Sequence, residues 1–162
     1  MDGLVNPVTI AGRAIGPGEP CFVIAEAGVN HNGDLDMARR LIDAAAAAGA
    51  DAVKFQTFDA DRLAAADAPK AAYQQETTGA QESQRDMLRR LQLSEADHRV
   101  LMDHARAAGI LFLSSPFDEA AADLLHRLDL PAFKIPSGEV TVSQRYSPIG
   151  MSAIFSKPST DV

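Results

Sequence analysis

The chain has 162 residues, of which 46% are hydrophobic, enough for one domain or for a piece of a larger one. A net charge of -7 and the lack of a basic run argue against nucleic-acid binding, which needs clustered Lys and Arg. One cysteine excludes an internal disulfide framework and fits a reducing compartment. No apolar stretch approaches the ~20 residues of a membrane span, and the N-terminus lacks the features of a signal peptide. We therefore expect a cytoplasmic protein without membrane or nucleic-acid partners.

Short strands and helices are predicted to alternate along the chain. A small hairpin is expected within residues 8–20, with its turn at Ala11-Gly12. Runs rich in Val, Ile, Leu and Phe predict strands, and none alternates cleanly with polar residues, as is typical of parallel strands covered on both faces. The predicted strands are 22–25, 52–55, 110–113 and 132–135, and the predicted helices are 34–48, 84–91, 95–108 and 119–128. This order predicts an α/β fold with a parallel sheet.

The step from the second strand to the third is much longer than the others. Residues 57–83 fill it with polar and alanine-rich sequence. A loop of this length within a compact domain is usually functional or disordered. In a (β/α) barrel it would lie on the face that carries the active site.

Polar side chains lie at or just beyond the end of each predicted strand. Lys54 and Gln56 share one face of their strand, because side chains repeat every two residues. Each such residue alone has an ordinary explanation as a cap, an ion-pair partner, a snorkelling lysine or a turn residue. Ligands of parallel α/β folds, however, gather at the carboxyl ends of the strands. Taken together the set suits a small phosphorylated, carboxylated metabolite with acid–base chemistry beside it; its members are Glu26, Lys54, Gln56, Ser114, Ser115, Lys134, Ser137 and Glu139.

The stretch "AEAGVNHNG", residues 25–33, places further polar groups behind Glu26. Asn30 and His31 are expected on the first loop over the pocket. His31 could be a ligand, a proton carrier or a hydrogen-bond partner that fixes the loop, and we favour the last. The other histidines fall in predicted helices and are expected at the surface or in packing.

The sequence resembles the N-terminal half of the bacterial sialic acid synthases. The segments "FVIAEAGVNHNGD", "DAAAAAGADAVKFQTF", "FLSSPFDEAAADLL" and "PAFKIPSGE" match that family in order and spacing, from about Val8 to Thr141. The family includes N-acetylneuraminate synthase and its relatives for legionaminic and pseudaminic acids, and "APKAAYQQETTGAQESQRDML" looks most like the legionaminate type. The resemblance implies a (β/α)8 TIM barrel, here about the first four βα units after a small N-terminal hairpin, in a domain-swapped homodimer.

The resemblance also implies a reaction and roles for the residues. Phosphoenolpyruvate condenses with an N-acylated mannosamine-type sugar and phosphate is released, with a divalent metal, Mn or Mg, as cofactor. By motif, Glu26 and Gln56 would contact the sugar, and Glu139 would be the acid–base residue. Phosphate would be bound by Lys54, Ser115 and Ser137, and the carboxylate end by Lys134. The family's metal-binding histidines lie in later strands, so no metal ligand is expected in this chain.

The resemblance stops after Thr141, and residues 142–162 are expected to be foreign to the fold, by frameshift or truncation. Residues 1–141 would form half of the barrel domain. One alternative is therefore a catalytically inactive half-barrel remnant. A further alternative is a lysine Schiff-base aldolase with Lys54 or Lys134 as nucleophile.

Overall fold

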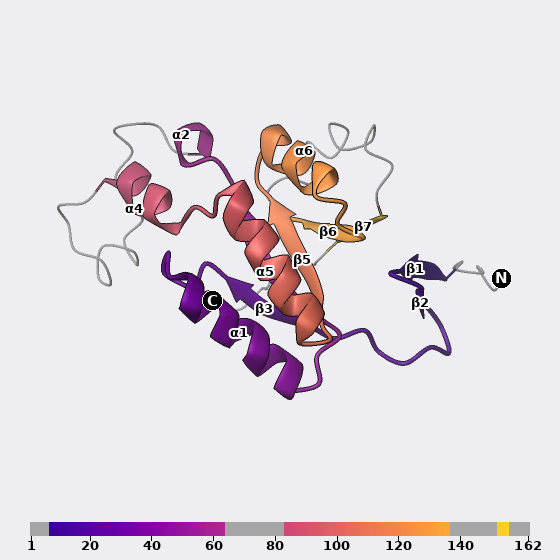
Figure 1. Ribbon diagram of the computed structural model, residues 1–162. Helices are drawn as coiled ribbons and strands as arrows, with labels where there is room; N and C mark the ends of the chain where they lie inside the picture. The colour runs from indigo at the N-terminus through magenta and orange to yellow at the C-terminus, as the bar shows by residue number, and fades with distance from the viewer. Residues whose placement is uncertain (1–6, 64–82, 137–151, 156–162) are drawn as a thin grey trace, which may run out of the picture.

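The computed structural model describes residues 7–63, 83–136 and 152–155. The elements in chain order are β1 (Val8–Ile10), β2 (Arg13–Ile15), β3 (Ile24–Gly28), α1 (Leu35–Ala47), β4 (Ala52–Thr57), α2 (Ala60–Leu63), α4 (Gln84–Leu91), α5 (Glu95–Ala107), β5 (Leu111–Pro116), α6 (Glu119–Arg127), β6 (Ala132–Ile135) and β7 (Ser152–Phe155). Strands and helices alternate through most of this order, as the sequence predicts (Figure 1).

The larger strands are parallel. β4 pairs with both β3 and β5, and β6 pairs with β7. β5 and β6 lie next to each other, so the two ladders continue one another across the molecule (Figure 1). β1 and β2 form the predicted antiparallel hairpin, turning through Ala11 and Gly12, both of which have positive φ.

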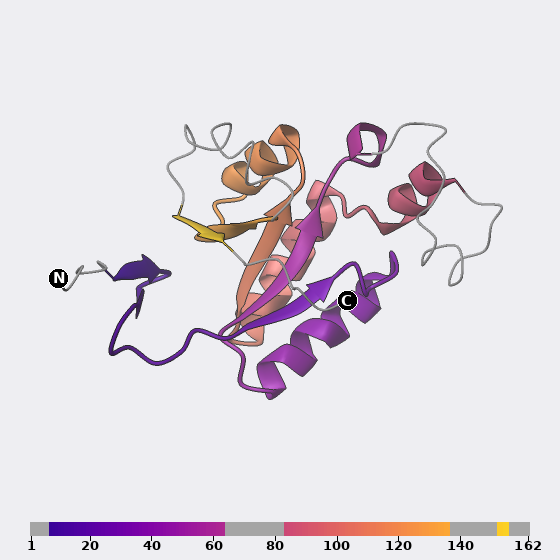
Figure 2. The same cartoon turned by 180° about the vertical axis from the view of Figure 1, so that it is seen from behind.

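Helices α1, α5 and α6 cover one face of this sheet, called here the helix face. Seen from behind, the strands lie in front of these helices (Figure 2). Because side chains alternate along a strand, every second residue of β4 to β6 points into this layer. The buried core there unites residues of strands and helices: Val53, Phe55, Phe112, Phe133 and Ile135 with Ala38, Ile42, Leu101, Ala105, Ala122 and Leu125.

The opposite face, called here the site face, begins with an apolar layer at the amino ends of the strands. Ala52, Leu113 and Ala132 form this buried cluster together with Ile10 of the hairpin. The hairpin is thus packed beneath the sheet, as the sequence predicts. An ion pair between Arg13 and Asp51 ties it to the body of the domain.

Side-chain caps set where the longer helices begin. Asp34 accepts hydrogen bonds from the N–H groups of Asp36 and Met37, so α1 begins directly after it. Ser94 and Asp97 form a complete capping box at α5. Asp118 accepts from the N–H group of Ala121 at the start of α6.

Three features differ from the predicted elements. β3 begins at Ile24 and runs to Gly28, so Glu26 lies inside the strand and not at its end. α2 lies within the segment for which no helix was predicted. β7 lies in the tail expected to be foreign to the fold, yet it pairs in parallel with β6, Ala132 opposite Ser152. β7 has four residues, too few for an apolar pattern that would predict a strand from the sequence.

A row of four buried rings runs through the core of the helix face. His31 lies 6.1 Å from Phe55, Phe55 stacks on Phe112 at 5.2 Å, and His98 meets Phe112 edge-on at 6.2 Å between ring centroids. Both histidines are fully buried. Burial disfavours the charged ring and lowers the pKa of each. Both rings are therefore neutral at pH 7.

We predict that acid destabilises the fold through these two rings. The unfolded chain binds their protons near pH 6.5, whereas the folded protein binds them only at lower pH. The free energy of unfolding should therefore be constant well above pH 6.5 and fall below it, by at most about 1.4 kcal/mol per pH unit for each ring. It should level off once the pH is below the lowered pKa values. Urea unfolding between pH 8 and 5 measures this.

The controls are His98→Gln, which should reduce the pH slope by about one proton, and His126→Gln at an exposed histidine, which should not change it. Equal slopes in all three proteins would contradict the prediction.

Gly33 makes a close backbone contact that predicts a second stability effect. Its φ is +81° and a Cβ there would lie 2.3 Å from the carbonyl oxygen of Arg90, whereas Gly49 has φ +77° with nothing within 4 Å. Gly49→Ala should cost about 1–2 kcal/mol for the left-handed backbone alone. Gly33→Ala should cost more, because the helix end carrying Arg90 must also move. Urea midpoints of the two variants test this, and equal losses would refute the clash.

Candidate functional site

Charged and polar side chains follow the apolar layer on the site face, toward the carboxyl ends of the strands. Glu26 of β3 lies opposite Lys54 of β4, and Gln56 of β4 lies opposite Ser115 of β5. Lys134 of β6 lies on the same face, because it comes two residues after Ala132 of the apolar layer. Glu26, Lys54, Gln56, Ser115 and Lys134 therefore share one face of the sheet, whereas Ser114, also predicted for the site, turns to the helix face because it precedes Ser115 in the strand.

An ion pair joins Glu26 to Lys54. The Lys54 side chain is 8% exposed, whereas that of Glu26 is 55% exposed. A lysine ammonium group is costly to bury without a partner. Glu26 supplies this partner and still presents carboxylate surface to whatever enters the site.

Gly28 leaves room for the Glu26 carboxylate. The pairing of β3 with β4 shifts between Glu26 and Gly28, and Gly28 has φ +53°. A Cβ at position 28 would lie 3.1 Å from Glu26 Oε1 and 3.7 Å from Gln56 Nε2. A side chain here would therefore press on both groups, which explains a glycine at the end of this strand.

Lys134 lies within electrostatic reach of the ion pair. Partial burial lowers the pKa of its ammonium group, the charge of Lys54 lowers it further, and Glu26 acts in the opposite direction. Two lysines against one carboxylate leave a positive excess when both are protonated. The cluster therefore favours an anion, which would relieve the repulsion between the two ammonium groups.

Ser115 adds a hydroxyl group that has no hydrogen-bond partner in the part of the chain that the structure describes. Its side chain is 1% exposed, and its Oγ has no hydrogen bond among the described residues. Buried hydroxyl groups are nearly always paired, so an unpaired one indicates a ligand or solvent position. On the same face as the two lysines, this hydroxyl group could donate to an anionic oxygen.

The structure does not bring His31 into this cluster. Its ring packs on Phe55 in the helix face, and its Nδ1 accepts a hydrogen bond from the N–H group of Gly33 at 3.0 Å. This is the loop-fixing arrangement that the sequence favoured, and not a position over the pocket. Asn30 is exposed in the same loop. Ser137 and Glu139 lie outside the described residues, and their predicted roles stay predictions.

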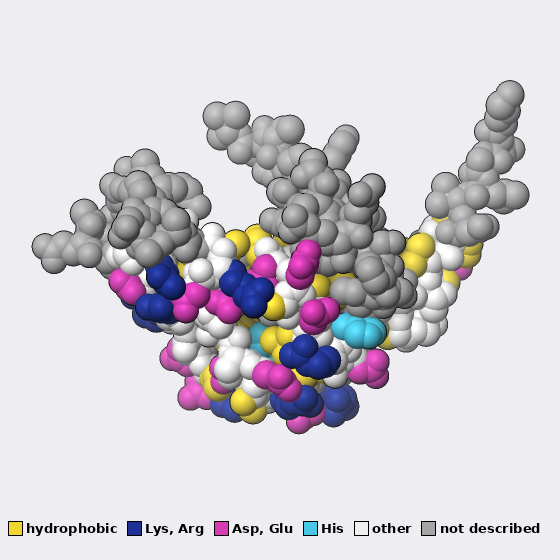
Figure 3. Space-filling model, turned by 90° about the horizontal axis from the view of Figure 1, so that it is seen from above, with side chains coloured by type: hydrophobic (Ala, Val, Ile, Leu, Met, Phe, Trp, Pro, Cys, Tyr) yellow, Lys and Arg dark blue, Asp and Glu magenta, His cyan; other side chains and the backbone are white. Residues whose placement is uncertain are grey.

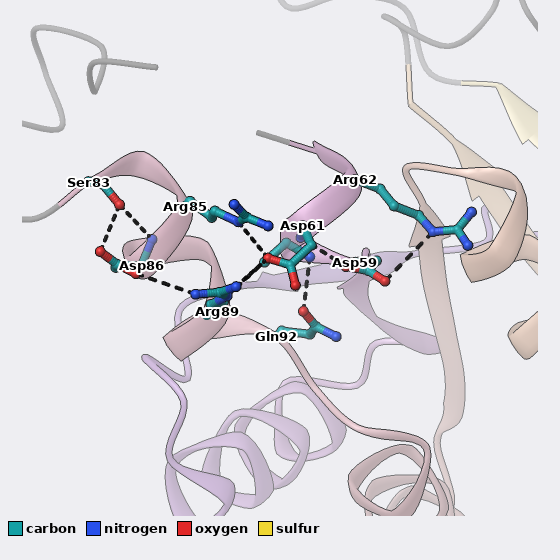
Figure 4. Close-up of polar contacts among 9 residues, drawn as sticks. Asp59, Asp61, Arg62, Ser83, Arg85, Asp86, Arg89 and Gln92 are labelled. Carbon is teal, nitrogen blue, oxygen red and sulfur yellow. Dashed lines mark hydrogen bonds and ion pairs between the residues drawn. The ribbon is translucent and has the colours of Figure 1, made fainter. Parts of the chain in front are cut away.

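Helices α2 and α4 meet beyond the carboxyl end of β4 and form a charged rim (Figure 4). Asp61 of α2 accepts from Arg85 Nε at 2.6 Å and from Arg89 Nε at 3.0 Å, both on α4. The pKa of the Asp61 carboxyl group is lowered, chiefly by the hydrogen bond from Arg85. Gln92 closes the contact by accepting from the N–H group of Ala60 at 2.9 Å. The rim is therefore held by charge-assisted bonds to a single carboxylate.

Two features of the site were missed by sequence reasoning. One is the glycine at position 28, whose positive φ and contact with Glu26 depend on the strand register. The other is a buried polar chain behind the site, in which His98 contacts Thr57 and Ser114 lies beside them. The hydroxyl residues next to Gln56 and Ser115 were the only sign of it in the sequence.

The described residues do not offer a metal site. In the ranges 7–63 and 83–136 no group of three or more His, Cys, Asp or Glu side chains is arranged to hold a metal ion. The divalent metal that the resemblance implies therefore finds no fitting ligand set here, and no chemical step is derived through it.

The surface charge is mixed. On the face seen in Figure 3, Lys and Arg side chains are interspersed with Asp and Glu over the described part of the chain. None of the described helices is both long and apolar enough to cross a bilayer.

Several synthases are similar to this chain in sequence. The chain is 53% identical over 120 residues to the N,N'-diacetyllegionaminic acid synthase of Campylobacter jejuni, covering 74% of this chain and 36% of the relative. It is 38% identical over 128 residues to the human N-acetylneuraminate-9-phosphate synthase, covering 79% of this chain and 35% of that protein. The chain thus spans about a third of the length of these relatives.

A solved structure matches almost the whole fold. The N-acetylneuraminic acid synthetase of Leptospira borgpetersenii, solved in complex with citrate, superimposes with a TM-score of 0.76 at 28% identity, covering 97% of this chain and 51% of that one. The likeness confirms an α/β fold of partial TIM-barrel type. The domain boundary at 141 stays a prediction.

The NeuB family model matches residues 41–149, from the second half of α1 past β6. This range contains Lys54, Gln56, Ser115 and Lys134 of the site. Together with the synthase relatives, the match shows that the chain belongs to the NeuB family.

Proposed function

We propose that this site binds phosphoenolpyruvate and belongs to a synthase that condenses it with an N-acylated mannosamine-type sugar, releasing phosphate. The observation that carries the proposal is the cluster on the site face, in which Lys54 pairs with Glu26, Lys134 lies within electrostatic reach of both, and Ser115 has a hydroxyl group without a partner among the described residues. Phosphoenolpyruvate has a phosphate and a carboxylate, which match two separate ammonium groups. The synthase relatives support this substrate class.

The geometry supports a division of roles. Ser115 and Lys54 lie on adjacent strands and would bind the phosphate, the hydroxyl group by donating a hydrogen bond and the ammonium group by charge. Lys134, on the next strand, would bind the carboxylate. The exposed side of Glu26 and the amide of Gln56 would then face the sugar, because they are the polar groups of the site face left for it.

In the proposed reaction C3 of the enolpyruvate forms a bond to the sugar aldehyde carbon, and water adds at C2. The tetrahedral intermediate loses phosphate by C–O cleavage. Negative charge grows on the departing phosphate, and Lys54 and Ser115 would stabilise it, while Lys134 would hold the carboxylate. Glu26, already an acceptor for Lys54, would orient the sugar's hydroxyl or aldehyde end.

The remaining properties follow the family resemblance and are part of the proposal. The working protein would be a cytoplasmic homodimer that uses Mn or Mg. It would make a sialic-acid-like nonulosonate, with the legionaminate type favoured by the 53% identical relative. The isolated chain, whose matched part covers about a third of the relatives' length, would bind the substrate without completing the reaction if the alternative of an inactive half-barrel is right.

Binding and phosphate release test the proposal. We expect phosphoenolpyruvate to bind to the chain in a calorimetric titration, and Lys134→Gln to weaken this binding about 10- to 100-fold, because one charged hydrogen bond is lost. Phosphate release would be followed with Mn and either N-acetylmannosamine or a 2,4-diacetamido-trideoxy analogue.

Glu19→Gln at an exposed position removes a charge outside the site and should leave binding unchanged. Binding without release would favour the inactive-fragment alternative for this chain alone. No binding of phosphoenolpyruvate by a folded chain would overturn the proposal.

A Schiff-base aldolase is kept as a second candidate because of Lys134. Burial and the neighbouring charge of Lys54 lower the pKa of Lys134, which is the direction that favours a nucleophilic amine. The synthase mechanism forms no imine, so we predict that borohydride with pyruvate or with the sugar leaves no adduct on the protein. Intact-mass analysis measures this, and an adduct that is lost in Lys134→Gln would establish the aldolase chemistry instead.

A further inference from the structure

A hydrogen-bond chain crosses the helix face directly behind the site. Thr57 Oγ1 lies 2.8 Å from His98 Nε2 and 2.7 Å from Ser114 Oγ, and His98 Nδ1 lies 2.8 Å from the carbonyl oxygen of Ser94. The side chains of Thr57, His98 and Ser114 are all buried, at 3% exposed or less. The chain joins the carboxyl end of β4, the middle of β5 and the first turn of α5.

The partners define the direction of every bond in this chain. A carbonyl oxygen only accepts, so His98 Nδ1 carries the proton and donates to Ser94. The neutral ring then accepts at Nε2, which requires the hydroxyl group of Thr57 to donate to it. With its proton committed, Thr57 Oγ1 accepts from the hydroxyl group of Ser114. Loss of the Thr57 hydroxyl would leave an acceptor and a donor unpaired in the core.

The chain is linked to the site through strand alternation. Thr57 follows Gln56 and Ser114 precedes Ser115, and Gln56 and Ser115 are register partners on the opposite face. A backbone hydrogen bond from the N–H group of Phe117 to Thr57 O, 3.0 Å, extends the pairing beyond the strands. Ser115 Oγ has no hydrogen bond of its own among the described residues, so its position depends on the backbone that carries it.

We propose that Thr57, His98 and Ser114 are positioning residues: they hold the ends of β4 and β5 in register so that Gln56 and Ser115 face the ligand in one geometry. The inference rests on the proposed function, since it assigns Ser115 to the phosphate of phosphoenolpyruvate. The hydroxyl groups of Thr57 and Ser114 act through the strands and do not touch the ligand.

The test compares Thr57→Val with Thr57→Ser. Valine keeps the shape of threonine and removes the hydroxyl group, whereas serine keeps the hydroxyl group and removes a methyl group that packs in the core. Calorimetric titration with phosphoenolpyruvate should show binding weakened about three- to tenfold in Thr57→Val and restored to within about twofold of the parent in Thr57→Ser. A role confined to stability would weaken both variants in proportion to their loss of stability.

A second measurement does not depend on the ligand. The NMR signals of the Ser115 backbone amide and the Gln56 side-chain amide should shift in Thr57→Val and keep their parent positions in Thr57→Ser. If the parent chain binds no phosphoenolpyruvate, the proposed function fails and these signals alone decide the positioning role. Unshifted signals in Thr57→Val, or equal weakening of binding in both variants, would overturn the inference.

Discussion

The buried ammonium group of Lys54 is the constraint on which the rest of the site depends. A lysine in the middle of a sheet is tolerated only with a counter-charge, and the register of β3 against β4 places Glu26 opposite it. The shift in pairing and the glycine at position 28 make room for that carboxylate. Glu26 and Lys54 neutralise each other. The charge of the nearby Lys134 is therefore the net positive charge of the cluster, and it would attract an anion.

The two faces of the sheet have different roles. The helix face carries the aromatic row, the neutral histidines and the packing of α1, α5 and α6, and so holds the strands in place. The site face changes along the strands from the apolar layer under the hairpin to lysines, carboxylate and hydroxyl. Adjacent residues such as Ser114 and Ser115 serve the two faces separately, because a strand turns each residue to the side opposite its neighbour.

Membership of the NeuB family agrees with this architecture, in which ligand groups gather at the carboxyl ends of parallel strands. The matched part of the chain covers about a third of the length of the synthase relatives. Among the described residues, the site face offers two cations, a hydroxyl group and a carboxylate. They do not account for a metal, since no fitting group of ligands lies among them.

The sequence by itself determined the element order, the caps at Asp34, Ser94 and Asp118, and the polar residues of the strand ends, because periodicity and capping are local properties of the chain. Only the tertiary structure decided which side chains meet. The ion pair of Glu26 with Lys54, the place of His31 behind the sheet and the chain from Ser114 to His98 depend on register and on packing between residues up to 57 positions apart. Likewise β7 forms as a strand because β6 offers an edge to pair with, which no local pattern records.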